Sequence, residues 1–359
     1  MTEYEWLKIG YTNQLIDLSV VEEIPFHVAY DQWFLMKRSL IKPQSIDRIE
    51  STWNKYYKGS FLFEKCISKI TEDDIITFMK DIFALNPKMT YKEYARIIQI
   101  VNNVLVYMRD RDLGGVRLYD WDRIKRYLPI EKLNKDMKKE YALKDSDIQK
   151  MIDGVLHYDL FPADKKSAAL CLCMNFYLGL RVGELAALGF NDFDFDRGVV
   201  KIYKTQAKMF DRSEDGSRSG VLVYRVVEDV KTVYSVREIP LMPEVREIYD
   251  RIKNYHESKG WNSPYMAYDG TDIVLYQSLE RTLRNLCILN DIPLINSHLI
   301  RKTFVTKLHF SGVPTRVISD LVGHSEIGTT ENSYILSYNN NYSTLYNYMK
   351  GGLQYCSAN

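Results

Sequence analysis

The sequence has few of the features that mark secreted, membrane-spanning or metal-binding proteins. Its five cysteines are odd in number and irregularly spaced, so they show neither a disulfide framework nor the ligand spacing of a zinc site. No apolar run approaches the ~20 residues that cross a bilayer. The acidic N-terminus lacks the basic start and apolar middle of a signal peptide. These absences favour a cytoplasmic protein with reduced thiols, no metal site and no membrane partner.

The chain also has little net charge, +1 at pH 7, but that charge is unevenly distributed. Residues 1–25 carry one basic and five acidic side chains, whereas residues 26–142 carry 22 Lys and Arg against 16 Asp and Glu. Binding to a phosphate backbone requires a local basic surface, not a basic whole chain. The segment 26–142 is therefore best suited to contact DNA, although its basic excess is small.

Length and patterning predict two domains in a chain of 359 residues. We expect a mainly α fold with a small antiparallel β-sheet. Residues 1–25 form an acidic segment, 26–130 a helical domain, 131–142 a charged linker, and 143–359 a mixed α/β domain with a C-terminal tail. For residues 131–142, a solvated helical face is the alternative.

Caps and apolar periodicity predict the individual elements. We expect helices at residues 26–40, 43–57, 72–85, 91–111, 145–157, 163–180, 243–258, 277–290, 297–310 and 314–322. Strand-like runs occupy residues 193–203, 221–227 and 236–241. Between the first two runs, residues 210–220 are rich in Ser, Gly, Asp and Arg, which predicts a mobile loop.

The most informative motifs lie between residues 297 and 334: S-H-L-I-R, then L-V-G-H-S, then G-T-T-E-N-S-Y. They contain His298, Arg301, His324 and Tyr334. The guanidinium of arginine matches phosphate oxygens, and histidine moves protons near neutral pH. A phenol becomes a useful nucleophile when a nearby group takes its proton or stabilises its charge. This set is suited to surround one phosphate.

A second arginine, Arg181, lies upstream in L-G-L-R-V-G-E-L, where an apolar helix meets a turn. Burial of an unpaired guanidinium is expensive, and Glu184 lies three residues further on. The pair has two interpretations. It is either a structural Arg–Glu pair or, together with the downstream motifs, part of a phosphate site.

In this order the motifs resemble the tyrosine recombinases (phage integrase family), especially integrases of phages and conjugative transposons. The resemblance covers residues 26 to about 350. It implies that residues 26–130 are a SAM-like core-binding domain and that residues 143–350 are the catalytic domain. Together they would form a C-shaped clamp on DNA.

The resemblance implies a role for each residue of the motifs. Arg181, Arg301 and His324 would stabilise charge on the non-bridging phosphate oxygens, while Glu184 supports them. His298 would accept or position the phenolic proton. Family members commonly have His directly after the second arginine, where this chain has Lys302.

One more residue is expected, an acid that protonates the leaving group. Residues 231–241 match the pattern K-T-x-x-S-x-R-x-I-P-L, and its lysine is Lys231. The resemblance implies that it protonates the departing 5′-oxygen. Such general acid catalysis typically supplies ~10²–10⁴-fold. Arg237, Lys208 and Lys204 are the alternatives.

Tyr334 is one of 27 tyrosines, so its position alone selects it as the nucleophile. It stands ten residues after His324, and related enzymes place the nucleophile nine or ten residues after this histidine. Tyr338 and Tyr342 on the same segment are the alternatives.

The resemblance implies a site-specific recombinase that joins DNA to a 3′-phosphotyrosine, without metal, ATP or another cofactor, and integrates or excises a mobile element. Type IB topoisomerase-like relaxation and a non-catalytic DNA-binding relative are the alternatives.

The implied partners are double-stranded DNA with specific sites, a homotetramer on the synapse, and accessory directionality or DNA-bending proteins. Residues 342–350 would dock on a neighbouring protomer or pack on their own domain. Many related integrases also carry an N-terminal arm-site DNA-binding domain, for which residues 1–25 are too few, so we expect either an enzyme that works without arm sites or another role for this segment, such as protein contact.

Overall fold

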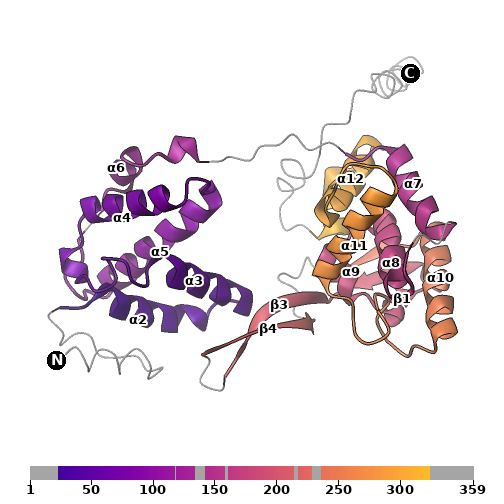
Figure 1. Ribbon diagram of the computed structural model, residues 1–359, viewed down its shortest axis with the longest axis horizontal. Helices are drawn as coiled ribbons and strands as arrows, with labels where there is room; N and C mark the ends of the chain where they lie inside the picture. Colours follow the sequence, from indigo (N-terminus) through magenta and orange to yellow (C-terminus); the bar gives the residue numbers. More distant parts are fainter. Residues whose placement is uncertain are drawn as a thin grey trace, which may run out of the picture. The chain divides into compact units, whose positions relative to one another are not determined.

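The computed structural model describes residues 23–117, 119–133, 142–157, 161–213, 217–228 and 236–323. The chain divides into two compact units (Figure 1). The first contains residues 1–137 and 208–223, and the second contains residues 138–207 and 224–359. The predictions for residues 1–22 and for the linker residues 134–141 concern residues outside these described ranges.

The first unit is a helical bundle. Its helices are α2 (Phe26–Arg38), α3 (Pro43–Tyr56), α4 (Glu72–Leu85), α5 (Tyr91–Arg109) and α6 (Trp121–Arg126), with short 3₁₀ turns at Ile67–Lys69 and Ile130–Lys132. Helix α4 begins where the sequence predicts, because Thr71 and Asp74 form a capping box and three acids occupy the first turn. Aromatic side chains fill the core between α2 and α3. The rings of Tyr30 and Trp53 stack with their centroids 3.6 Å apart.

A β-hairpin occupies much of the region where a mobile loop was expected. Strands β3 (Thr205–Arg212) and β4 (Arg218–Val227) form a two-stranded sheet. The guanidinium of Arg212 forms ion pairs with Asp47 and Glu50 of α3, and the Phe210 N–H donates to Asp47 Oδ2 over 2.8 Å. The loop prediction is therefore wrong for residues 210–212 and 218–220, because partners more than 160 positions away in the sequence hold β3 against α3.

The second unit packs helices around a small antiparallel sheet. Strands β1 (Phe193–Asp194), β2 (Val199–Ile202) and β5 (Arg237–Pro240) follow the order β1-β2-β5, with Val200 opposite both Phe193 and Ile239. The helices are α7 (Asp145–Leu156), α8 (Lys166–Leu178), α9 (Val182–Ala187), α10 (Pro243–Lys259), α11 (Tyr276–Leu289), α12 (Ser297–Phe310) and α13 (Thr315–Val322). The predicted fold class, mainly α with a small antiparallel sheet, is confirmed.

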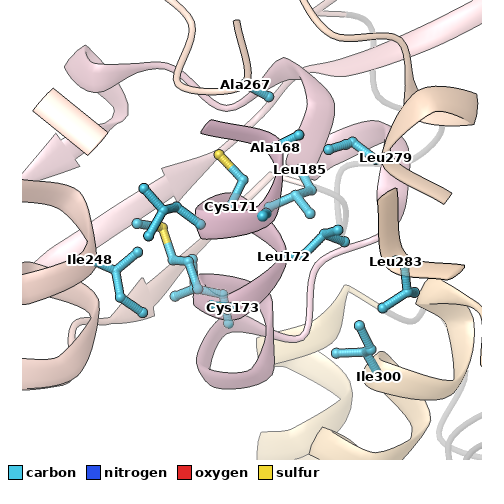
Figure 2. Close-up of a cluster of buried hydrophobic side chains, with 14 of the residues drawn as sticks. Ala168, Cys171, Leu172, Cys173, Leu185, Ile248, Ala267, Leu279, Leu283 and Ile300 are labelled. Atoms are coloured by element: carbon cyan, nitrogen blue, oxygen red, sulfur yellow. The ribbon is translucent and has the colours of Figure 1, made fainter. Parts of the chain in front are cut away.

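Helix α8 is the centre of the second unit because it is apolar on every side. It packs against α7, α10, α11 and α12. Figure 2 shows its Cys171, Leu172 and Cys173 among side chains of these neighbours, including Ile248 of α10 and Leu283 of α11. Burial raises the pKa of the Cys171 thiol to about 12, so it stays protonated. The four cysteines within the described ranges are all buried and form no disulfide: Cys66, Cys171, Cys173 and Cys287.

Among the described residues, no helix is long and apolar enough to cross a membrane. In the same part of the chain, no three His, Cys, Asp or Glu side chains gather in a way that could hold a metal ion.

Candidate functional site

The turn that follows α8 is fixed by one buried amide. Asn175, which is fully buried, accepts a hydrogen bond from the Leu180 N–H at Oδ1 over 2.7 Å and donates from Nδ2 to the Leu180 carbonyl over 3.2 Å. Gly179 between them adopts φ 60° and ψ 30°, the left-handed conformation typical of a helix end. The chain therefore leaves α8 along one path, which ends at Arg181.

Asn175 was not identified from the sequence as part of the site. Its polarity could have identified Asn175, because it lies in a helix whose other central residues are apolar. A fully buried amide requires hydrogen-bond partners.

Gly179→Ala should destabilise the protein more than Gly260→Ala. Both glycines end a helix in the left-handed conformation, with φ of 60° and 66°, so each alanine should cost about 1–2 kcal/mol of backbone strain. A Cβ at residue 179 would also stand 2.3 Å from Cδ1 of Phe304, whereas none of the surrounding atoms lies within 4 Å of a Cβ at residue 260. Overpacking should add about 1–3 kcal/mol at Gly179 alone.

Urea unfolding of the two variants measures this difference. Equal losses in the free energy of unfolding would show that the turn tolerates a side chain against Phe304.

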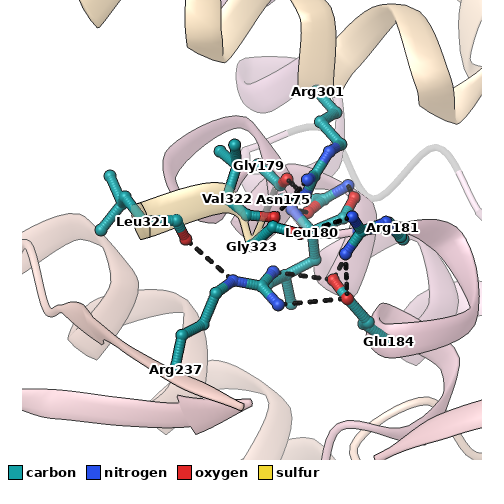
Figure 3. Close-up of polar contacts among 10 residues, drawn as sticks. All are labelled: Asn175, Gly179, Leu180, Arg181, Glu184, Arg237, Arg301, Leu321, Val322 and Gly323. Atoms are coloured by element: carbon teal, nitrogen blue, oxygen red, sulfur yellow. Dashed lines mark hydrogen bonds and ion pairs between the residues drawn. The ribbon is translucent and has the colours of Figure 1, made fainter. Parts of the chain in front are cut away.

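One carboxylate lies between two guanidiniums (Figure 3). Glu184, whose side chain is 3% exposed, accepts from Arg181 Nη1 at Oε1 over 2.8 Å and from the Arg181 backbone N–H at Oε2 over 2.9 Å. Arg237, at the start of β5, donates from Nη1 and Nη2 to the two oxygens over 3.1 and 2.8 Å. The Arg181–Glu184 contact that the sequence suggested is thus half of a three-residue ion cluster.

Three neighbouring arginines keep Glu184 ionised despite its burial. Desolvation alone would raise the pKa of this carboxyl, but the charge and hydrogen bonds of Arg237, followed by the charges of Arg181 and Arg301, outweigh it. The pKa of Glu184 falls to about 2. Three guanidiniums near one carboxylate leave a local excess of positive charge.

Three arginines also bind the end of α13, through the carbonyls of residues 321–323 (Figure 3). Each arginine donates to one carbonyl. Arg237 Nε donates to the Leu321 carbonyl over 2.8 Å, and Arg301 Nη2 donates to the Val322 carbonyl. Arg181 Nη2 donates to the Gly323 carbonyl over 3.0 Å. The last carbonyls of a helix lack partners within the helix and form its negative end, so cations stabilise them. The point where α13 ends, directly before His324, is therefore fixed by side chains from three separate segments.

Helix α12 carries the H-x-x-R motif and begins where predicted. Asn296 caps it, and its side chain accepts from the Leu299 N–H over 2.9 Å. Arg301 is fully buried and donates from Nη1 to the Gly179 carbonyl over 2.9 Å. His298, one turn earlier, is exposed. Arg181 is intermediate, with 39% of its side chain exposed.

The Phage integrase family profile matches residues 142–341, more than half of the chain. The chain belongs to the phage integrase family. The resemblance predicted from the motifs is thereby confirmed.

Curated relatives are similar to this chain over different lengths. A "Tyrosine recombinase XerC-like" protein of Caldanaerobacter subterraneus subsp. tengcongensis is 25% identical, over 84% of this chain and 76% of the relative. A "Tyrosine recombinase" of Pseudothermotoga lettingae is 28% identical, over 52% of this chain and 54% of the relative.

Solved structures share the fold. The Tn1549 transposon integrase, solved with transposon right end DNA, aligns with a TM-score of 0.65 at 17% identity, covering 93% of this chain and all of that one. A lambda integrase dimer bound to a core site aligns with a TM-score of 0.59 at 12% identity, covering 92% and 84%.

Within this integrase chain, two of the three alternatives to Lys231 as leaving-group acid, Lys204 and Arg237, are held in other contacts. Lys204 donates to Asp192 over 2.9 Å. Burial alone would lower the pKa of Lys204, but the hydrogen bond and charge of Asp192 raise it. Arg237 binds both carboxylate oxygens of Glu184. Because Lys204 is ion-paired and its pKa is raised, it is a poor proton donor.

The remaining predicted residues of the integrase site lie outside the described residues. These are Lys231, His324 and Tyr334, together with the alternative nucleophiles Tyr338 and Tyr342 and the C-terminal segment 342–350. The structure brings together Arg181, Glu184 and Arg301, adds Arg237, and places His298 one turn before Arg301 on α12.

Proposed function

We propose that this chain is a site-specific DNA recombinase that cleaves and rejoins strands through a 3′-phosphotyrosine link. The observation that carries the proposal is the grouping of Arg181, Arg301 and Arg237 at the end of α13. In phosphoryl transfer, preorganised positive charge on the phosphate oxygens supplies most of the catalysis. Family membership supports the same reaction.

In the first step, the phenolic oxygen of Tyr334 attacks the scissile phosphorus and forms a phosphotyrosine bond while the bond to O5′ breaks. His298 takes the phenolic proton, and Lys231 donates a proton to the departing O5′. Arg181, the more exposed guanidinium, binds a non-bridging oxygen. Arg301 adds a second charge from the buried side, and His324 donates a hydrogen bond.

In the second step, a 5′-hydroxyl of the partner strand attacks the same phosphorus, and the phenol of Tyr334 leaves. The energy of the broken bond is kept in the covalent link, so the exchange requires neither ATP nor a metal ion.

The partners of this reaction are part of the proposal. We infer that residues 26–130 bind double-stranded DNA and that residues 143–359 carry the chemistry. A homotetramer would assemble on two recombination sites in the cytoplasm, with accessory directionality or DNA-bending proteins. Integration or excision of a mobile element is favoured, because one structural relative is a transposon integrase bound to transposon DNA.

The chemistry can be tested with duplexes enriched from a random pool by binding to the full chain. A nick near the cleavage point lets the short product dissociate and traps the adduct. We expect a covalent protein–DNA species in EDTA without ATP, and strand exchange between two intact duplexes.

The other outcomes decide between the alternatives. Relaxation of supercoiled DNA without exchange would indicate a topoisomerase-like enzyme. Binding of the enriched duplex without any adduct would indicate a non-catalytic relative.

A further inference from the structure

Arg237 is a buried cation with two separate sets of acceptors. Its side chain is 4% exposed. Its Nη atoms reach both oxygens of Glu184, and its Nε donates to the Leu321 carbonyl over 2.8 Å. A planar fork that binds a carboxylate through two bonds fixes the geometry as well as the charge of its partner.

Both acceptors lead to Arg181. Glu184 binds the Arg181 guanidinium and the Arg181 backbone N–H. Leu321 lies two residues before Gly323, whose carbonyl accepts from Arg181 Nη2. Arg237 therefore acts on Arg181 through two shared partners, the Glu184 carboxylate and the end of α13. Arg237 itself is buried, whereas Arg181 is partly exposed.

We propose that Arg237 is a positioning residue for the phosphate-binding arginine: it fixes Glu184 and the end of α13, and through both it sets the place of the Arg181 guanidinium. This inference rests on the proposed function. It assigns Arg237 a role different from proton donation to the leaving group.

Loss of Arg237 should displace the Arg181 guanidinium and remove one of the positive charges that balance the Glu184 carboxylate. A displacement of about 1 Å at a catalytic group can cost about 10²-fold in rate. We therefore expect Arg237→Gln to lower the rate of single-turnover cleavage by about 10²-fold, with little change in DNA affinity, because Arg237 is shielded from solvent.

The test compares three substrates of the same sequence in single-turnover cleavage. They carry a normal phosphate, a 5′-bridging phosphorothiolate, or a methylphosphonate at the scissile position. A thiolate leaves without a proton, so the second substrate bypasses a missing general acid. A methylphosphonate lacks one anionic oxygen, so the third depends less on a well-placed Arg181.

Lys231→Ala is the matched control. The phosphorothiolate should restore its cleavage but should not restore that of Arg237→Gln. The defect of Arg237→Gln should shrink on the methylphosphonate, while that of Lys231→Ala should not.

Two results would overturn the proposal. Restoration of Arg237→Gln by the phosphorothiolate would make Arg237 a proton donor, and an equal defect on phosphate and methylphosphonate would make its role merely structural. If Arg237→Gln fails to fold, Arg237→Lys is read by the same criteria, because it keeps a charge opposite Glu184 but loses the two-bond fork. Failure of the wild type to cleave the normal phosphate would instead refute the proposed function.

Discussion

Tyr334→Phe is expected to abolish covalent attachment to DNA, lowering cleavage by at least ~10⁴-fold, because no other group replaces a lost nucleophile. Affinity for the enriched duplex should stay within about twofold of wild type, since one hydroxyl is removed. A gel that separates covalent from non-covalent complexes measures both quantities on the nicked substrate.

Tyr338→Phe and Tyr342→Phe are the matched controls, since each removes one hydroxyl from the same segment. Both should form the adduct at rates near that of wild type. An adduct that persists in Tyr334→Phe and disappears in one of the controls would move the nucleophile to that tyrosine.

Glu184→Gln is expected to cause the largest loss of stability, about 3–5 kcal/mol, because it removes the buried carboxylate that pairs with Arg237. The amide keeps the size of the side chain but has no negative charge, and it offers the two guanidiniums one acceptor oxygen in place of two. Cleavage should fall as well, because Arg181 loses its partner. Thermal and urea unfolding measure the first effect, and single-turnover cleavage measures the second.

Acid unfolding gives an independent check on Glu184. Its pKa is about 2 in the folded protein against a usual 4.5. The ionised form is therefore favoured by folding, and its contribution is present above pH 4.5 and is lost as the pH falls toward 2. The shift corresponds to about 3 kcal/mol. Wild type should lose this stability over that range and Glu184→Gln should not; parallel pH profiles would contradict the ion cluster.

Elements with local signals could be predicted from the sequence. Helix α4 begins after the Thr71 cap with its acidic first turn, and α12 spans Ser297–Phe310 as expected. These boundaries depend on side chains within one turn of the helix end. The β3–β4 hairpin could not be found in this way, because Arg212 is held by acids of α3 far away in the sequence.

The same distinction applies to the site. Arg181 and Glu184 are three residues apart, so their contact follows from helical spacing. Arg237 was considered only as a substitute proton donor, because its partners lie 53 and 84 positions away. Arg301 and Arg181 also bind the backbone carbonyls of Val322 and Gly323. Every residue has a backbone carbonyl, so residue type cannot predict these contacts.

The proposed chemistry depends on which residue and which phosphate form the covalent link, and both can be identified in the wild-type protein. The adduct formed on a nicked duplex labelled on one strand is digested with nuclease and protease, and the modified peptide is sequenced by mass spectrometry. We expect one nucleotide joined through its 3′-phosphate to the oxygen of Tyr334, with a free 5′-hydroxyl on the other product. A link to a 5′-phosphate, to serine or to another tyrosine would contradict it.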